Sequence, residues 1–140
     1  MPLKILIIAN HPIIKFGLKE IIGEIPGYDV IEIDELERRS LDLLSKQEFD
    51  IAIVDLPMSD QSSPIDFALI EDVSRNSPAS EFIILTASDN PIALRKLDSL
   101  QPSGMVSKSD PLSCISEALG AISIGKRYHS PTVRKHLAIS

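Results

Sequence analysis

Short, nearly continuous apolar runs alternate along the chain with longer stretches in which apolar residues recur at helical spacing. The first run, Leu3–Ala9, is rich in isoleucine and too short to form a buried helix, so it predicts a strand that is covered on both faces. Similar runs predict further strands at 28–33, 50–55, 81–86 and 104–108. The first of these is more polar, which is typical of a strand at a sheet edge.

Amphipathic stretches separate these predicted strands. After the first strand, one helical face is formed by Ile14, Leu18, Ile21, Ile22 and Ile25, and Pro26-Gly27 ends the helix. Further helical patterns cover 35–46, 64–76, 91–100 and 111–124. Alternating strands and helices predict a doubly wound α/β fold, with a parallel sheet, right-handed crossovers and helices on both faces.

Several of the ten prolines mark the expected starts of helices. Four of them come a few residues after a predicted strand: Pro12, Pro64, Pro91 and Pro111. Proline is favoured in the first helical turn because its missing N–H would be unpaired there in any case. Ser63, Asn90 and Asp110 are good N-cap residues in front of three of them. Pro131 predicts the start of a helix that leaves the domain, after a linker-like segment at 125–129.

Composition restricts the class of protein further. The chain has 140 residues, a length that by prior holds one domain. Its 44% hydrophobic and 24% charged residues are ordinary for a globular protein and exclude whole-chain disorder. A net charge of −6, 4% aromatic residues and the lack of tryptophan disfavour a nucleic-acid-binding surface on this chain.

The cysteine content and the length of the hydrophobic runs indicate in which cell compartment the protein is located. Cys114 is the single cysteine, which excludes an intramolecular disulfide or a cysteine-based zinc site and is compatible with a reducing cytosol. No apolar run approaches about 18 residues, and the chain starts without the apolar region of a signal peptide. We therefore expect a cytoplasmic protein that has no contact with a membrane.

A carboxylate, a hydroxyl and an ammonium group lie at the carboxyl ends of three successive predicted strands, on Asp55, Thr86 and Lys108. Ligands of doubly wound sheets bind beyond these ends, and a buried acid is costly unless it is paired or functional. Asp55 could accept a phosphoryl group as nucleophile, with Thr86 donating a hydrogen bond to one phosphoryl oxygen and Lys108 neutralising another. An ordinary ion pair between Asp55 and Lys108 is the alternative, although the three residues together favour function.

These residues lie in motifs that resemble the receiver domains of two-component response regulators, especially the NarL/LuxR type. The matching pieces are Ile-Ile-Ala-Asn10-His11-Pro12-Ile, Ile-Val-Asp55-Leu-Pro-Met58, Ile-Leu-Thr86, Gly104-Met-Val-Ser-Lys108 and Gly125-Lys-Arg-Tyr-His-Ser-Pro131. The resemblance covers residues 3 to about 137. It implies a flavodoxin-like (βα)5 receiver fold with a five-stranded sheet in the order 2-1-3-4-5. The receiver domain would span 1–125, and 126–140 would be a linker and the start of a helix towards an output domain that this chain lacks.

The chain departs from the family at the magnesium site. Receivers usually carry two acidic residues just before the His-Pro, and here those positions hold Ala9 and Asn10. Mg²⁺ prefers hard oxygen ligands that include carboxylates. Only Asp55, the neutral amide of Asn10 and, by family analogy, the backbone carbonyl of Pro57 are left as ligands. We therefore expect Mg²⁺ binding to be weak or absent and phosphorylation to be slow or absent, as in an atypical receiver.

Other positions also differ from the family. Met105 stands where receivers commonly have an aromatic or bulky switch residue, three positions before the lysine. Asp34, Glu35 or Asp60 could replace a lost acid, although Asp34 is better explained as the cap of the second helix.

The resemblance implies a signalling domain in a phosphorelay and not an enzyme, with Asp55 as a phosphoryl acceptor at most. Its partners would be a sensor histidine kinase or a phosphotransfer protein and a second copy of the chain. DNA would be contacted only through a helix-turn-helix output domain, for transcription regulation. The missing acids favour a version that has lost its phosphorylation input and works by protein contacts.

The alternative is a small flavodoxin-like enzyme or cofactor-binding domain. It would need a Ser/Thr/Gly-rich phosphate loop, an acid pair or a Gly-x-Gly-x-x-Gly motif after the first strand. The segment Asn10-His-Pro-Ile-Ile-Lys15 has none of these.

Overall fold

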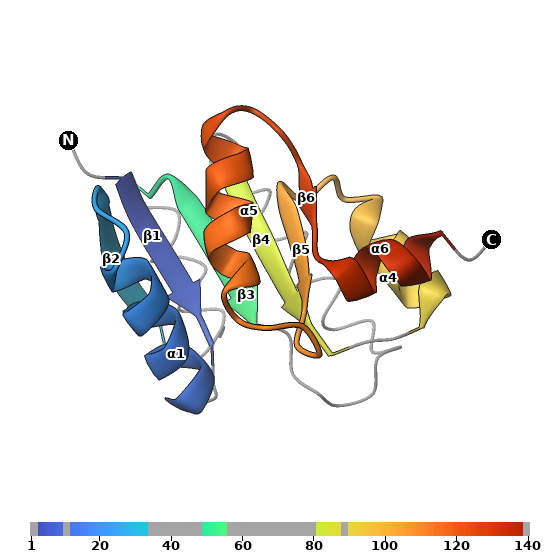
Figure 1. Ribbon diagram of the computed structural model, residues 1–140, viewed down its shortest axis with the longest axis horizontal. Coiled ribbons are helices and arrows are strands. Elements are labelled where there is room, and N and C mark those ends of the chain that lie inside the picture. The colour runs from blue at the N-terminus through green and yellow to red at the C-terminus, as the bar shows by residue number, and fades with distance from the viewer. Residues whose placement is uncertain (1–2, 10–11, 34–48, 56–80, 88–89, 139–140) are drawn as a thin grey trace.

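The computed structural model describes residues 3–9, 12–33, 49–55, 81–87 and 90–138 of the chain (Figure 1). The strands are β1 (Leu3–Ile8), β2 (Tyr28–Ile33), β3 (Ile51–Asp55), β4 (Glu81–Thr86), β5 (Gly104–Ser107) and β6 (Tyr128–His129). The helices are α1 (Pro12–Gly23), α4 (Pro91–Asp98), α5 (Cys114–Ser123) and α6 (Pro131–Leu137). The helices predicted at 35–46 and 64–76 lie outside the described residues.

The strands form one parallel sheet in the order β2-β1-β3-β4-β5-β6. This confirms the doubly wound α/β fold and the order of the five expected strands. The expected number of strands is wrong, because β6 forms inside the segment predicted as a linker and pairs Gly104 with Tyr128 and Met105 with His129. Gly125, with a φ of 75°, lets the chain turn back after α5. A strand of two residues is too short to leave a hydrophobic pattern.

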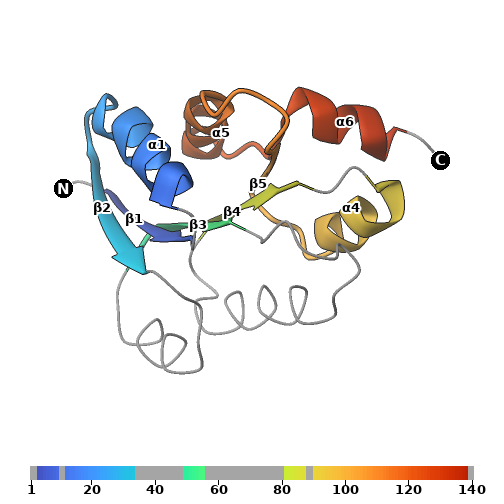
Figure 2. The ribbon, with the colours of Figure 1, turned by 90° about the horizontal axis from the view of Figure 1, so that it is seen from below.

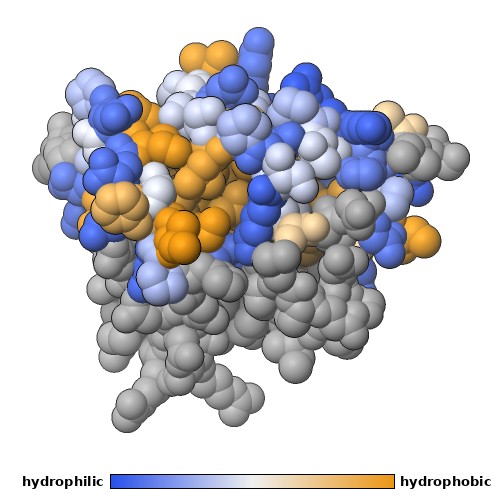
Figure 3. Space-filling model, turned by 60° about the horizontal axis from the view of Figure 1, so that its bottom comes forward, coloured by the Kyte–Doolittle hydropathy of each residue, from blue (hydrophilic) through white to orange (hydrophobic). Residues whose placement is uncertain are grey.

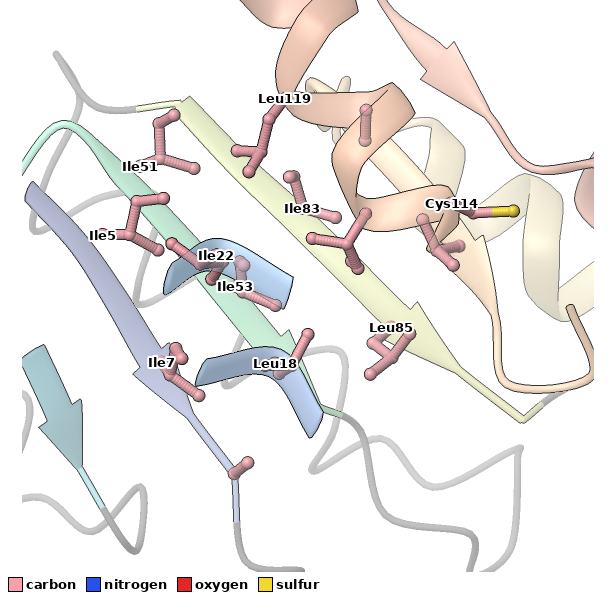
Figure 4. Close-up of a cluster of buried hydrophobic side chains, with 14 residues drawn as sticks. Ile5, Ile7, Leu18, Ile22, Ile51, Ile53, Ile83, Leu85, Cys114 and Leu119 are labelled. Atoms are coloured by element: carbon pink, nitrogen blue, oxygen red, sulfur yellow. The ribbon is translucent and has the colours of Figure 1, made fainter. Parts of the chain in front are cut away.

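The apolar strands are buried because helices cover both faces of the sheet. Ile7, Ile53 and Leu85 lie on one face and pack against α1 and α5 (Figure 4). Alternate residues such as Leu6 and Ile84 point to the other face and pack against α4. Figure 2 shows this arrangement, with α1 and α5 on one side of the sheet and α4 on the other. The two clusters hold the strand ends in place.

Three of the predicted helix starts are confirmed. Pro12, Pro91 and Pro131 are the first residues of α1, α4 and α6. Asn90 caps α4, since its Oδ1 accepts a hydrogen bond from the amide of Ile92 at 2.9 Å. Pro64 lies outside the described residues.

The predicted start of the last core helix is wrong. Residues 112 and 113 form a turn, and α5 begins only at Cys114, which is buried. Asp110 does not cap α5, because its carboxylate accepts hydrogen bonds from Thr132 instead.

The C-terminal segment packs on the domain. The side chains of Arg127 and His129 contact the Oδ1 atom of Asp98 in α4, at 2.7 and 2.8 Å. Arg127 Nε also donates to the carbonyl of Pro102 at 3.1 Å. Val133 of α6 is fully buried in the cluster that contains α4. None of the helices in the described part of the chain is long and apolar enough to cross a membrane.

Two substitutions in α1 test this packing. Leu18 is fully buried, so Leu18→Ala should lower the free energy of unfolding by about 2–5 kcal/mol. Ile13, in the same helix, is 84% exposed, so Ile13→Ala should change the free energy of unfolding of the monomer by less than about 0.5 kcal/mol. Urea unfolding monitored by circular dichroism measures both values. Similar losses in the two variants would contradict the described orientation of α1.

Candidate functional site

The sheet brings together the ends of the strands that carry the three predicted site residues. Strands β3, β4 and β5 are neighbours and run parallel, so their carboxyl ends meet at one edge (Figure 1). Asp55 is the last residue of β3 and pairs with Leu85, while Thr86 ends β4 and pairs with Ser107. Lys108 follows β5 directly. The predicted convergence at one edge is therefore what the structure has.

Asp55 and Lys108 form an ion pair between Lys108 Nζ and Asp55 Oδ1. The side chain of Asp55 is 1% exposed and that of Lys108 is 12% exposed. A carboxylate this deeply buried is costly unless an opposite charge compensates it, and the ammonium supplies that charge. The alternative of an ion pair is therefore present. It is also the arrangement in which a lysine already stands beside the oxygen of a phosphoryl acceptor.

Thr86 is held directly between the two charged residues in the sheet. It is 3% exposed, and its carbonyl accepts a hydrogen bond from the amide of Lys108 at 2.8 Å. This bond extends the pairing of β4 and β5 by one residue and fixes the backbone from which the lysine side chain starts. Thr86 and Lys108 are thus joined through their backbones at the ends of neighbouring strands, and the Lys108 ammonium contacts the Asp55 carboxylate.

The residue that follows β1 brings an apolar side chain to the site. Ile8 pairs with Val54, so Ala9, one residue further along, lies beside Asp55. Ala9 is 2% exposed and packs in the same cluster as Ile7 and Ile53, which alternate in phase with Asp55. The position where receivers usually have an acid therefore holds a buried methyl group, which cannot bind a metal.

The described residues fit Mg²⁺ poorly. Asp55 supplies one carboxylate, which is already paired with Lys108. No group of three His, Cys, Asp or Glu side chains that could hold a metal occurs among the residues that the structure describes. The other predicted ligands, Asn10 and Pro57, lie outside those residues, as do Asp34, Glu35 and Asp60. Met105, the predicted switch position, is fully buried.

Sequence reasoning missed the residues that support Lys108. The amide of Ser107 donates to Ser130 Oγ at 2.9 Å, and the amide of Ser109 donates to Ser107 Oγ at 3.0 Å. Ser130 follows Ser107 by 23 residues, so no local motif joins them. The resemblance placed Ser130 in the linker, and only the pairing of β6 with β5 brings it to the site.

Comparison with known proteins supports the same interpretation. No protein-family model matches the chain. The transcriptional regulatory protein RcsB of Escherichia coli K12 is 27% identical over 135 residues, which are 96% of this chain and 62% of RcsB. The nitrate/nitrite response regulator NarP of the same strain is 24% identical over 136 residues, 97% of this chain and 62% of NarP. The chain thus spans less than two thirds of the length of these curated relatives.

Solved structures match more completely. The isolated REC domain of RcsB from Salmonella enterica serovar Typhimurium, in the presence of phosphomimetic BeF3−, matches with a TM-score of 0.86 at 26% identity, covering 98% of this chain and 99% of that one. A structure of two RcsB dimers bound to two parallel DNAs matches with a TM-score of 0.81 at 26% identity, covering 96% and 66%. A whole receiver domain superposes on this chain and its sequence relatives are transcriptional and response regulators, so the chain is similar in fold and sequence to response-regulator receiver domains of the NarL/LuxR type.

Proposed function

We propose that this chain is a signalling receiver in which Asp55 is a weak phosphoryl acceptor. The observation that carries the proposal is the buried Asp55–Lys108 ion pair at the carboxyl edge of the sheet, next to Thr86. A structural ion pair needs no hydroxyl at the neighbouring strand end and no placement at the ligand-binding edge. A phosphoacceptor needs both.

In the proposed reaction an Asp55 carboxylate oxygen attacks the phosphorus of a phosphoryl donor. A new O–P bond forms, the bond from phosphorus to the donor's leaving group breaks, and the leaving group keeps the electron pair. Lys108 moves its ammonium contact from the carboxylate to a phosphoryl oxygen, and the Thr86 hydroxyl donates a hydrogen bond to another. Asp55 is thus a phosphoryl acceptor and not a catalyst that turns over.

We further propose that this phosphorylation is slow. Receiver domains of this family generally use Mg²⁺ for phosphorylation. The methyl group of Ala9 occupies the place of one usual acid, and Lys108 already neutralises Asp55. With this charge count, affinity for the ion is low. Protein contacts are therefore proposed as a main route of signalling for this chain.

The proposed partners follow from the relatives. RcsB is a transcriptional regulatory protein, and one RcsB structure contains dimers bound to DNA. By this likeness we propose transcription control through a helix-turn-helix output domain. A sensor histidine kinase or phosphotransfer protein would be the phosphoryl donor, and a second copy of the chain would be a partner. DNA would be bound only by the output domain.

An exposed apolar area on α1 supports self-association. Ile13 is 84% exposed and Phe16 is 66% exposed, both on α1. Figure 3 shows hydrophobic residues gathered on the side of the molecule that carries α1. Exposed apolar groups that lie together often mark contact sites between proteins.

The acceptor assignment is tested by Asp55→Asn. With acetyl phosphate and Mg²⁺, the wild-type chain should slowly gain the mass of one phosphoryl group, and Asp55→Asn should gain none because an amide is not a nucleophile. Asp50→Asn, at the opposite end of the same strand region and exposed, is the matched control and should behave as wild type. Intact-protein mass spectrometry reads the result. Modification that persists in Asp55→Asn would exclude Asp55 as the acceptor.

The cause of weak Mg²⁺ binding is tested by restoring the acids. Ala9→Asp combined with Asn10→Asp should raise the rate of Asp55 phosphorylation at low Mg²⁺ by at least about tenfold, since ion affinity follows the number of carboxylates. Ala9→Ser combined with Asn10→Ser is the uncharged control and should leave the rate unchanged. Rates are measured as initial phosphoryl incorporation against Mg²⁺ concentration. No gain from the acids would show that something other than charge limits the site.

The role of α1 in self-association is tested by placing a charge on it. Phe16→Glu should shift the monomer–dimer equilibrium towards monomer by at least about tenfold, because the charge would be desolvated in an apolar contact. Ile92→Glu is a matched control on α4, where Ile92 is 75% exposed, and should have no effect. Sedimentation equilibrium measures both. A dimer that weakens only in Ile92→Glu would move the interface to α4.

A further inference from the structure

The loop that carries Lys108 is joined to the start of α6 by buried hydrogen bonds. The amide of Ser107, directly before Lys108, donates to the hydroxyl of Ser130 at 2.9 Å. Ser130 is fully buried, directly before α6, and its own amide donates to the carbonyl of Met105 in β5 at 2.9 Å. The residue before the lysine is therefore bonded to the residue before the helix.

A second connection lies on the other side of Lys108. Asp110 accepts hydrogen bonds from the amide of Thr132 at 2.9 Å and from its hydroxyl at 2.6 Å, so that its carboxylate holds the first turn of α6. Burial by itself would raise the pKa of Asp110, but hydrogen bonds from Ser130 and Thr132, together with the charge of Arg134, hold the pKa below its ordinary value of 3.8. The carboxylate is therefore charged at neutral pH and accepts strong hydrogen bonds.

The loop between these two connections has little freedom of its own. The amide of Ser109 donates to Ser107 Oγ at 3.0 Å, and the amide of Asp110 donates to the carbonyl of Ser107 at 3.0 Å. The amide of Lys108 donates to the carbonyl of Thr86 at 2.8 Å. A displacement of the Lys108 backbone must therefore change either its bond to β4 or the bonds that hold α6.

We propose that Ser130 and Thr132 are positioning residues that hold the Lys108 loop, and that they couple the position of α6 to the state of the Asp55 site. The inference rests on the proposed function, in which Lys108 moves towards a phosphoryl oxygen. Coupling between two sites is reciprocal, so a change at Lys108 loosens α6, and a change at the start of α6 alters the Lys108 loop.

A second attachment of the C-terminal segment provides an internal comparison. The side chains of Arg127 and His129 bind Asp98 in α4, and Arg127 also donates a hydrogen bond to the carbonyl of Pro102. This attachment holds the segment before α6, whereas Ser130 and Thr132 hold the start of α6. Changes at the two attachments should therefore have different effects on the Asp55 site.

The first experiment measures amide hydrogen exchange by NMR in the whole chain. In Lys108→Met, the α6 amides of Arg134 and Ala138 should exchange at least about fivefold faster than in wild type, relative to α1 amides that report overall stability. Lys4→Met makes the same chemical change at the exposed amino end of β1 and should leave this ratio unchanged. If Lys108→Met does not fold, the double variant Asp55→Asn and Lys108→Met, in which neither residue of the ion pair is charged, takes its place.

The second experiment tests the reverse direction. Thr132→Val removes the hydroxyl at nearly constant shape and should speed exchange of the Lys108 amide at least about fivefold, and Thr132→Ser should restore the wild-type rate. Asp98→Asn should loosen the Arg127–His129 segment without changing the Lys108 amide. A merely structural role for Thr132 would affect α1 and Lys108 amides alike.

Neither experiment requires phosphoryl transfer, so the two proposals can fail separately. The coupling would be overturned if Lys108→Met left the exchange rate of the α6 amides, relative to the α1 amides, unchanged. It would also be overturned if Thr132→Val left the exchange rate of the Lys108 amide unchanged. If both effects are seen while wild-type Asp55 takes up no phosphoryl group, the coupling stands and the acceptor role of Asp55 fails.

Discussion

The buried ion pair between Asp55 and Lys108 is the constraint around which the rest of the site is arranged. The Asp55 side chain is 1% exposed, and removing one partner of such a pair typically costs about 3–5 kcal/mol because the other charge is left uncompensated. The pair therefore requires that the ends of β3 and β5 remain at a fixed separation. Strand β4, which lies between them and bonds to the Lys108 backbone through Thr86, sets that separation.

The same pair balances the charge of the site within the described part of the chain. A cluster of carboxylates at a sheet edge is stable only with a cation to balance it, whereas a single carboxylate is balanced by one lysine. Ala9, which is buried just after the end of β1, adds no charge beside Asp55. The charge of the Asp55 carboxylate is thereby compensated by a residue of the chain itself.

The C-terminal segment extends this arrangement to the helix at the end of the chain. Strand β6 adds a sixth strand to the sheet beside β5. After β6, the amide of Ser130 donates a hydrogen bond to the carbonyl of Met105 in β5, and the amide of Thr132 donates one to the carboxylate of Asp110, which follows Lys108 by two residues. Ahead of α6, the side chains of Arg127 and His129 bind the carboxylate of Asp98 in α4. Helix α6 is therefore part of the folded domain, and it begins close to the carboxyl end of β5.

The amino-acid sequence by itself determined five of the strands, three of the helix starts and the placement of Asp55, Thr86 and Lys108 at strand ends, because hydrophobic periodicity and proline chemistry act over a few neighbouring positions. Only the tertiary structure decided the sixth strand, the late start of α5 and the bonding of Asp110 to Thr132. The sixth strand and the bonding of Asp110 depend on contacts between residues more than 20 positions apart. A two-residue strand, or a polar side chain with several possible partners, leaves no local pattern. The hydrogen bonds of buried polar groups must be satisfied somewhere, and the packing of the whole chain determines which partner is within reach.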